Sequence, residues 1–284
     1  MVVRLVAVLL PLALALGGCQ SLASRATTSM AQNISAAVLD QRDTAIVRDG
    51  GPAYLIAIDG MVEGDPESET LLLAGARLYA AYASAFVRDP DRLRLLTGHA
   101  RRYAERALCL RRTALCGVRD MSFETFERAL AEADGDDVPA LFGLGSAWAT
   151  WIQASSSDWD AIADLPKVQA LMERVVALDS AFESGTAHLY LGVLYTLRPE
   201  SMGGRPEDGR RHFEAAVALS EGRNLQAKVL FARQYARLVF DRALHDRLLE
   251  EVVADDPEAE GFTLANVLAQ EEARALLAES EDYF

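Results

Sequence analysis

Lysine is almost absent from this chain of 284 residues, in which Lys167 and Lys228 are the only two. The 28 lysines and arginines are outnumbered by 42 aspartates and glutamates, so the formal net charge at pH 7 is −14. A surface this acidic repels nucleic acid and anionic lipid headgroups. No basic stripe along the sequence compensates for this charge, which excludes a nucleic-acid-binding role.

Catalytic and metal-binding patterns are missing as well. The four histidines, His99, His188, His212 and His245, are scattered, with no His-Glu-x-x-His motif and no pair at metal-ligand spacing. We expect His188, at a core-facing position of its helix, to be a packed or pore-edge residue. Ser146 lies in a predicted helix and not in a strand-to-helix elbow. No two carboxylates stand together in an apolar setting. The sequence therefore predicts no enzyme activity, no metal site and no cofactor.

Strand patterns are the third absence. No segment alternates apolar and polar residues for more than a few positions, whereas apolar residues spaced three and four apart recur along the chain. The fold class is therefore predicted to be all-α. Weak self-similarity, with acid-rich turns placed before helices, favours an α-solenoid of degenerate helical hairpins that forms a single domain over residues 29–284.

The longest apolar run at the start of the chain, residues 5–16, is too short to span a membrane as a helix. It follows Arg4 and ends in Gly17 and Gly18, as a cleaved export signal over residues 1–18 would. The segment Leu16-Gly17-Gly18-Cys19 resembles a bacterial lipobox. By that resemblance Cys19 becomes the lipidated first residue, on a polar tether that reaches residue 28. Gln20 after it favours the outer membrane, facing the periplasm. An ordinary signal peptide with a chance cysteine is the alternative.

Two further cysteines, Cys109 and Cys116, lie seven residues apart. On one unbroken helix they would be about 10.5 Å apart along the axis, whereas a disulfide needs Cα atoms within about 7 Å. Export to the periplasm permits oxidation. We therefore expect a disulfide, with the helix ending between the two cysteines and Gly117 helping the chain to turn. Unpaired thiols are the alternative.

Capping residues, glycines and prolines divide the chain into helices. Ser29 opens a helix that is expected to run to about Arg48, before Asp49-Gly50-Gly51-Pro52 breaks it. Asp89-Pro90 and Ser122 are further predicted starts. The helix over 67–87 is apolar on most sides but contains Arg77, so we interpret it as a buried bundle helix. Other helices are expected at 138–154, 166–179, 184–198, 206–220, 224–238, 241–254 and 262–279.

Residues 188–216 predict two antiparallel helices that approach closely. Gly192 shares a face with Leu191 and Tyr195, and Phe213 shares a face with Gly209 and Ala216. Small residues on one helix can accept the ring of the other, which is the tetratricopeptide arrangement with an insertion at the turn. The Gly203-Gly204 loop of that insertion suggests a phosphate loop or a tight interhelical turn. The absence of a preceding strand and of a Gly-Lys-Ser/Thr ending favours the turn.

Aromatic residues on the predicted helices are candidates for the wall of a ligand cavity. They are Trp148, Trp151, Tyr190 and Tyr195, together with the Gly203-Gly204 loop. Core packing is the competing interpretation, because aromatic residues at helical spacing commonly fill a core.

Motifs over nearly the whole mature chain resemble the TatT family, the T component of TRAP (tripartite ATP-independent periplasmic) transport systems. They are the lipobox at Cys19, Asp65-Pro66, the segment SMGGRPEDGRRHFEAAVAL, the segment ARLVFDRALHDRLLEEVV and the tail FTLANVLAQEEARALLAESEDYF. The resemblance implies a membrane-anchored, periplasm-facing TPR-like protein that assembles as a homo-trimer with a pore in each protomer. It further implies a TRAP-type periplasmic substrate-binding protein as partner and an apolar or amphipathic small ligand.

Three hypotheses follow from these observations. The first is a TRAP-associated lipoprotein that binds a substrate-binding protein and holds or passes a ligand without covalent chemistry. The second is a TPR-like scaffold lipoprotein for cell-envelope or outer-membrane protein assembly. The third, a lipid- or cell-wall-modifying enzyme, requires clustered titratable groups in a cleft, and the sequence offers none.

Overall fold

The computed structural model describes residues 29–284. The predicted signal peptide, the lipidated Cys19 and the tether up to residue 28 lie outside the described residues. Within the described part the chain is helical and contains no strand, which confirms the all-α class. None of the described helices combines the length and apolarity that a membrane span needs.

Residues 29–39 are helical. After them come α2 (Thr44–Gly64), α3 (Glu69–Phe86), α4 (Pro90–Arg111), α5 (Phe123–Ala131), α6 (Val138–Ala154), α7 (Trp159–Ala163), α8 (Leu165–Leu178), α9 (Thr186–Tyr195), α10 (Pro206–Leu219), α11 (Leu225–Leu230), α12 (Arg242–Ala254), α13 (Thr263–Ala278) and α14 (Ser280–Tyr283). Short 3₁₀ turns occur at Thr113–Leu115, Gly135–Asp137, Phe182–Gly185 and Glu200–Met202, and a π-helix follows α11 at Phe231–Ala236.

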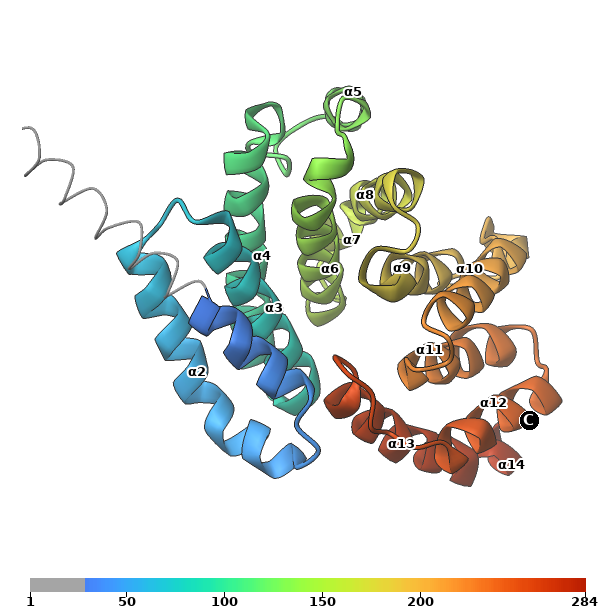
Figure 1. Ribbon diagram of the computed structural model, residues 1–284. Coiled ribbons are helices and arrows are strands. Elements are labelled where there is room, and N and C mark those ends of the chain that lie inside the picture. Colours follow the sequence, from blue (N-terminus) through green and yellow to red (C-terminus); the bar gives the residue numbers. More distant parts are fainter. Residues whose placement is uncertain (1–28) are drawn as a thin grey trace, which may run out of the picture.

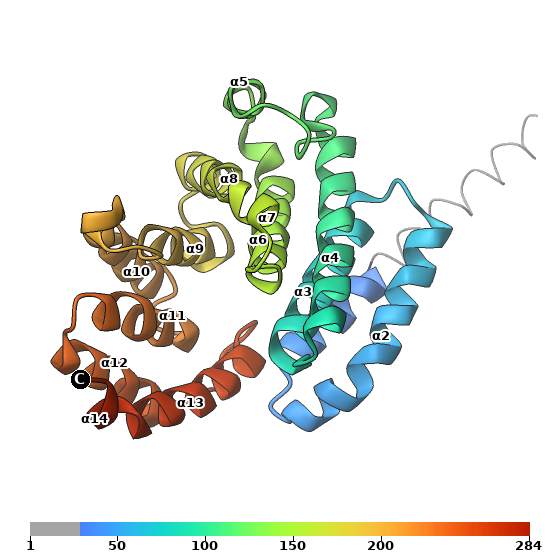
Figure 2. The same cartoon turned by 180° about the vertical axis from the view of Figure 1, so that it is seen from behind.

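Neighbours in the chain are also neighbours in space. The closest packing joins α3 to α4, α4 to α6, α6 to α8, α9 to α10 and α12 to α13. Figures 1 and 2 show the result as an arc of helices, in which α13 returns to the side of α2 and residues 29–39. Most of the packing therefore joins helices that are close together in the sequence.

Local capping rules account for several helix starts. Asp89 accepts a hydrogen bond from the backbone N–H of Arg92, and Pro90 occupies the first turn of α4. Ser122 accepts one from the N–H of Thr125 at the start of α5. These contacts satisfy amide groups that a helix N-terminus leaves unpaired. The predicted starts at Asp89-Pro90 and Ser122 are confirmed.

The expected break at Gly50-Gly51-Pro52 is wrong. The first helix ends at residue 39, and α2 then runs without interruption through Pro52. Tyr82 on α3 explains this. A Cβ atom on Gly51 would lie 2.5 Å from the Tyr82 ring, so the glycine admits that ring. The Tyr82 hydroxyl donates to the carbonyl of Arg48 at 3.2 Å, which is the acceptor that Pro52, having no N–H, leaves unpaired in the helix.

The end of α4 carries the two cysteines. The helix stops at Arg111, and a disulfide joins Cys109 to Cys116 with their Cα atoms 4.5 Å apart. Gly117 follows with φ +67°, a backbone conformation that glycine adopts without steric cost. The chain therefore folds back directly after the helix.

Two hydrophobic cores fill the arc. The first core joins the buried apolar side chains from residues 29–39 to α9, with Trp148 among its largest fully buried members. The second core joins α9 to α13 around Phe213. Because α9 contributes side chains to both cores, it is the element that connects them.

Candidate functional site

The hairpin of α9 and α10 has the close approach that its glycines predict. A Cβ atom on Gly192 would lie 2.8 Å from the Phe213 ring, and one on Gly209 would lie 3.0 Å from the carbonyl oxygen of Gly192. Both positions therefore accept only glycine at the observed spacing. The predicted contact between Gly192 and Phe213 is confirmed.

The Gly203-Gly204 loop forms the turn of this hairpin. Gly203 has φ +79°, and a Cβ atom on Gly204 would lie 1.7 Å from the Arg198 carbonyl oxygen. The Gly204 N–H donates to the carbonyl of Pro199 at 3.0 Å, and the Arg205 N–H donates to that of Tyr195 at 3.1 Å. The backbone N–H groups of Gly204 and Arg205 are therefore already paired within the turn.

The four candidate aromatic residues lie in different surroundings. Trp148 is fully buried in the first core, whereas Trp151 is partly exposed between two arginines. Tyr190 packs edge-on against Phe142, with ring centroids 6.1 Å apart. Tyr195 is buried and donates its hydroxyl to Glu173. No ring contact among these four is found in residues 29–284, so they do not form one aromatic wall.

Arg205 links Tyr195 to the glycine loop. Its guanidinium lies 4.1 Å from the centroid of the Tyr195 ring. Burial, and then the hydrogen bond to Glu173, raises the pKa of Tyr195 to about 12. The phenol therefore stays protonated as a donor across the physiological pH range. Of the candidate residues, only Tyr195 and the glycine loop are brought together.

Two histidines that look unrelated in the sequence meet at the same hairpin. His188 Nδ1 lies 2.7 Å from His212 Nδ1, and Ser180 Oγ lies 3.0 Å from His188 Nε2. Burial lowers the pKa of His188. Burial, and then the neighbouring His188, lowers the pKa of His212 to about 4. The two rings thus share one hydrogen bond as neutral imidazoles at pH 7.

The sequence did contain a signal for this pair. His188 precedes Gly192 by one helical turn, and His212 adjoins Phe213. Because Gly192 and Phe213 pack against each other, the antiparallel register also brings the two histidines together. Spacing along the chain alone does not show this pair, since it carries no information about the register between helices.

A second polar cluster joins three helices of the first core. Tyr79 on α3 and Tyr103 on α4 donate to the two carboxylate oxygens of Asp59 on α2, at 2.6 and 2.7 Å. His99 stacks on Tyr79, with ring centroids 4.4 Å apart. Burial, and then the bond to Asp59, raises the pKa of both tyrosines, and burial lowers the pKa of His99. Both tyrosine hydroxyls and both carboxylate oxygens are therefore paired within the cluster.

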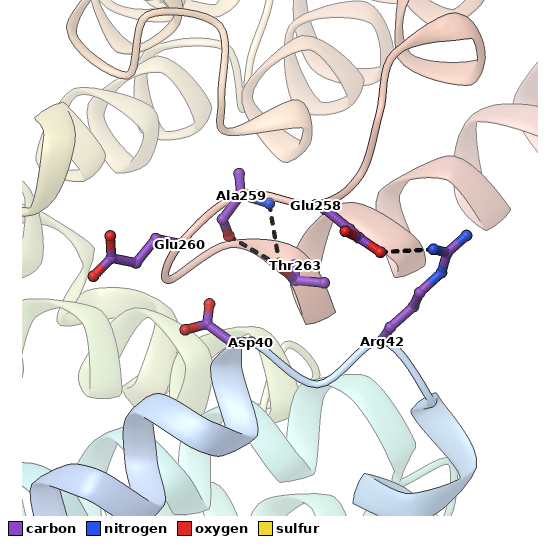
Figure 3. A pocket seen from close by; sticks show the side chains of 6 residues that line it. All are labelled: Asp40, Arg42, Glu258, Ala259, Glu260 and Thr263. Atoms are coloured by element: carbon purple, nitrogen blue, oxygen red, sulfur yellow. Dashed lines mark hydrogen bonds and ion pairs between the residues drawn. The ribbon is translucent and has the colours of Figure 1, made fainter.

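The two ends of the arc meet at what we call the closure seam, residues 40–42 against residues 258–263. Arg42 binds Glu258 at 2.7 Å, and the Gly261 N–H donates to Asp40 at 2.5 Å. A cavity of about 440 Å³ lies between them, with Glu260 and Thr263 on its wall (Figure 3). Three of its lining side chains are carboxylates, so the cavity is unsuited to an apolar ligand.

A second pocket of about 310 Å³ lies between α10, α11 and α12. Its apolar lining comes from Val217, Ala218, Phe231, Leu244 and Leu248, and its charged lining from Arg210, Glu214, Lys228, Arg247 and Glu251. Ligand pockets in proteins combine such an apolar lining with a few polar groups. This is the described pocket whose chemistry suits a small amphipathic molecule.

A last feature of these polar clusters is the arrangement of their potential metal-ligand groups and hydrogen-bonding atoms. In the part of the chain that the structure describes, no three His, Cys, Asp or Glu side chains form a group that could hold a metal ion. The histidine pair has Ser180 as its further hydrogen-bond partner, and the Asp59 cluster is internally bonded.

Comparison with known proteins identifies the family. A family model described as the TRAP transporter T-component matches residues 40–284. A protein of Treponema pallidum (strain Nichols), described only as uncharacterized, is 26% identical over 267 residues, which are 86% of this chain and 81% of the relative. The family match covers every helix from α2 to α14 and implies an accessory role beside TRAP transporters. The chain therefore belongs to the TRAP transporter T-component family.

Proposed function

We propose that this protein is a lipoprotein accessory to a TRAP-type transport system. In this proposal Cys19 anchors it to the outer membrane, with the helical domain in the periplasm. The domain docks a periplasmic substrate-binding protein and holds or passes an apolar or amphipathic small ligand. The observation that carries the proposal is the family match over residues 40–284, which spans both hydrophobic cores and the closure seam.

A pull-down from cross-linked cells, with the lipidated protein as bait and mass spectrometry as readout, tests the partner. Recovery of a TRAP-type substrate-binding protein is the expected result. A Cys19→Ala bait serves as the control for anchoring, because it should leave the membrane fraction and still bind the partner in solution. Recovery of outer-membrane assembly factors, without any substrate-binding protein, would contradict the proposal.

The pocket of α10–α12 is our proposed place for the ligand. The partly buried Leu244 lines it, so Leu244→Gln makes the lining more polar without emptying the core. We expect this variant to weaken binding of a fluorescent long-chain fatty acid by about tenfold, since burying several CH₂ groups contributes about 0.8 kcal/mol each. Leu95→Gln is the matched control, because Leu95 is 66% exposed on α4. Equal binding by both variants would place the ligand elsewhere.

A scaffold for cell-envelope or outer-membrane protein assembly is the second candidate function. The observation in its favour is Trp159, which is 82% exposed at the start of α7, because exposed tryptophans are enriched in protein interfaces. The homo-trimer implied by the family resemblance is a further proposal, and light scattering on the purified domain measures it directly. Trp159→Ser with unchanged partner recovery would remove the scaffold argument.

A further inference from the structure

Three arginines gather around one indole in this acidic chain. The guanidinium carbon of Arg101 lies 4.6 Å from the Trp151 ring centroid, and that of Arg119 lies 5.1 Å from it. Arg102 Nη1 and Trp151 Cδ1 each lie 3.6 Å from the position that a Cβ atom on Gly98 would take. Guanidinium groups beside an aromatic ring are stabilised by the ring quadrupole, yet three of them in one place repel one another.

Arg101 is the buried member of this group. Its side chain is 8% exposed, its Nη1 donates to Glu105, and its Nε has no hydrogen-bond partner among the described residues. Burial raises the pKa of Glu105, against the lowering effect of the arginines. The remaining carboxylate contact is Asp164, 3.7 Å from Arg119. A buried guanidinium with an unused N–H is costly unless something accepts its hydrogen bond.

Gly98 on α4 leaves a small gap, with the room of one methyl group, beside two further donors. A Cβ atom built on it would lie 3.6 Å from Arg102 Nη1 and 3.7 Å from Trp151 Nε1. Both atoms carry N–H groups, and neither donates a hydrogen bond to another described residue. Arg102 also enters no ion pair within residues 29–284. Two donors without a partner among the described residues, the exposed Arg102 and the half-buried Trp151, therefore border one small space beside the buried Arg101.

The segment that carries Arg119 is held in place by a buried lysine. Lys167 is 7% exposed, and its Nζ donates to the carbonyls of Val118 and Arg119 at 3.0 and 2.8 Å. These bonds fix the backbone on one side of Trp151. The backbone that carries Arg119 is thus positioned before any ligand arrives, which reduces the entropic cost of binding.

We propose that Gly98, Arg101, Arg102, Arg119 and Trp151 form an oxyanion-binding site that takes a carboxylate or phosphate group. The oxyanion accepts hydrogen bonds from Arg102 Nη1 and Trp151 Nε1 over Gly98. Its charge offsets the repulsion among the three guanidinium groups. Charge-assisted bonds of this kind are roughly twice as strong as neutral ones. The site goes beyond the transport role proposed above, and either can fail without the other.

Indole N–H resonances provide the measurement. The protein labelled with ¹⁵N-tryptophan is titrated with inorganic phosphate and, separately, with hexanoate, against chloride at matched ionic strength. Trp151→Phe identifies the Trp151 signal. We expect a saturable shift of that signal with at least one of the two anions and none with chloride. A shift with phosphate alone identifies a phosphate site, and a stronger response to hexanoate identifies a carboxylate site. Absence of a saturable shift with both would overturn the proposal.

Gly98→Ala is the sharpest variant, because it closes the gap without changing any charge. Its methyl group makes only ordinary van der Waals contacts at 3.6 Å, so the protein should fold. We expect it to weaken anion binding by about tenfold or more, the effect of losing one charge-assisted hydrogen bond. Gly60→Ala on α2, whose Cβ would meet nothing within 4 Å, is the matched control and should bind as the parent does.

A second pair of variants separates a built site from general attraction of anions. Arg102→Gln and Arg92→Gln remove the same charge from the same helix, but only Arg102 borders the gap. We expect Arg102→Gln to weaken binding by about tenfold and Arg92→Gln to leave it within about twofold. Equal weakening by the two variants would show nonspecific electrostatics and overturn the site.

Discussion

The two hydrophobic cores hold their helices together in different ways. In the first core, glycines on α2 and α3 admit aromatic rings from the next helix, as Gly51 admits Tyr82 and Gly75 admits Tyr103. In the second core, buried amide side chains bind the backbone of neighbouring segments. Asn266 accepts from the Leu225 N–H and donates to the carbonyls of Arg223 and Pro257.

This difference follows from the regularity of the helices. The first core contains long helices such as α2, α3 and α4, whose backbones pair internally and can approach each other closely. The second core contains the six-residue α11, a π-helix at Phe231–Ala236 and loops at both ends of α12. Such segments leave more backbone groups unpaired, so side-chain amides are needed to satisfy them. The second core therefore adds hydrogen bonds from buried side-chain amides to the glycine–ring packing that both cores use, as Gly192 admits Phe213 there.

Removal of Asn266 should have the largest effect on stability. Asn266 is fully buried, and Asn266→Ala leaves one N–H and two carbonyls without their partner. We expect the free energy of unfolding to fall by about 3 kcal/mol, measured by urea denaturation. Glu271→Ala, an exposed position on the same helix, should change it by less than about 0.5 kcal/mol. Similar losses for the two variants would refute the role of the amide.

Replacing glycines of the first core with alanine should change the free energy of unfolding in opposite directions at packed and at open positions. A Cβ atom on Gly75 would lie 2.7 Å from the ring of Tyr103, which its bond to Asp59 holds in place. Gly75→Ala should therefore lower the free energy of unfolding by about 1–3 kcal/mol. Gly60→Ala, with nothing in its way, should raise it by about 0.5–1 kcal/mol. If thermal unfolding shows both variants changing stability in the same direction, the packing around each glycine does not determine the effect of the substitution.

The Asp59 cluster should make the first core sensitive to alkali. The pKa values of Tyr79 and Tyr103 are raised in the folded state, first by burial and then by their bonds to Asp59. Their contribution is present below pH 10, the usual tyrosine pKa, and is lost as pH rises above it, because the unfolded state then releases protons more readily. Asp59→Asn should cost about 1 kcal/mol at pH 7 and flatten this alkaline loss. If urea denaturation above pH 10 shows the same loss of stability with rising pH in Asp59→Asn and in the parent, the prediction is contradicted.

The histidine pair should make the junction of the two cores sensitive to acid. The folded pKa of His212 is lowered to about 4, so its contribution is present above pH 6.5 and is lost as pH falls towards 4. We expect NMR titration to show a His212 ring that stays neutral at pH 5.5. In His212→Gln the decrease in stability between pH 6.5 and 5 should be smaller than in the parent. A His212 ring that titrates near pH 6.5 would refute this.

The closure seam should contribute least to the free energy of unfolding. Arg42 and Glu258 are an exposed pair, with side chains 68% and 57% exposed. Arg42→Gln is expected to lower the free energy of unfolding by about 0.5 kcal/mol or less at low salt, and by nothing measurable at high salt, because solvent and ions screen such pairs. A loss of several kcal/mol would mean that the seam, and not the two cores, holds the ends of the arc together.

Functional candidates were harder to predict than the helices. Helical spacing made four aromatic residues candidates for one cavity wall: Trp148, Trp151, Tyr190 and Tyr195. The structure instead distributes them among the first core, an arginine cluster and two separate contacts. Which helical face a residue occupies can be read from periodicity. What that face packs against depends on crossing angle and register between helices, and these are set by residues far away in the chain.

The sequence by itself determined the helical class, the starts at Asp89-Pro90 and Ser122, and the contact of Gly192 with Phe213. Caps, prolines and helical spacing act within a few residues, so a local segment contains all the information they need. Only the tertiary structure decided that α2 continues through Pro52 and that His188 meets His212. Each of these depends on a partner supplied by another helix, because the missing hydrogen bond or neighbour lies outside the segment that requires it.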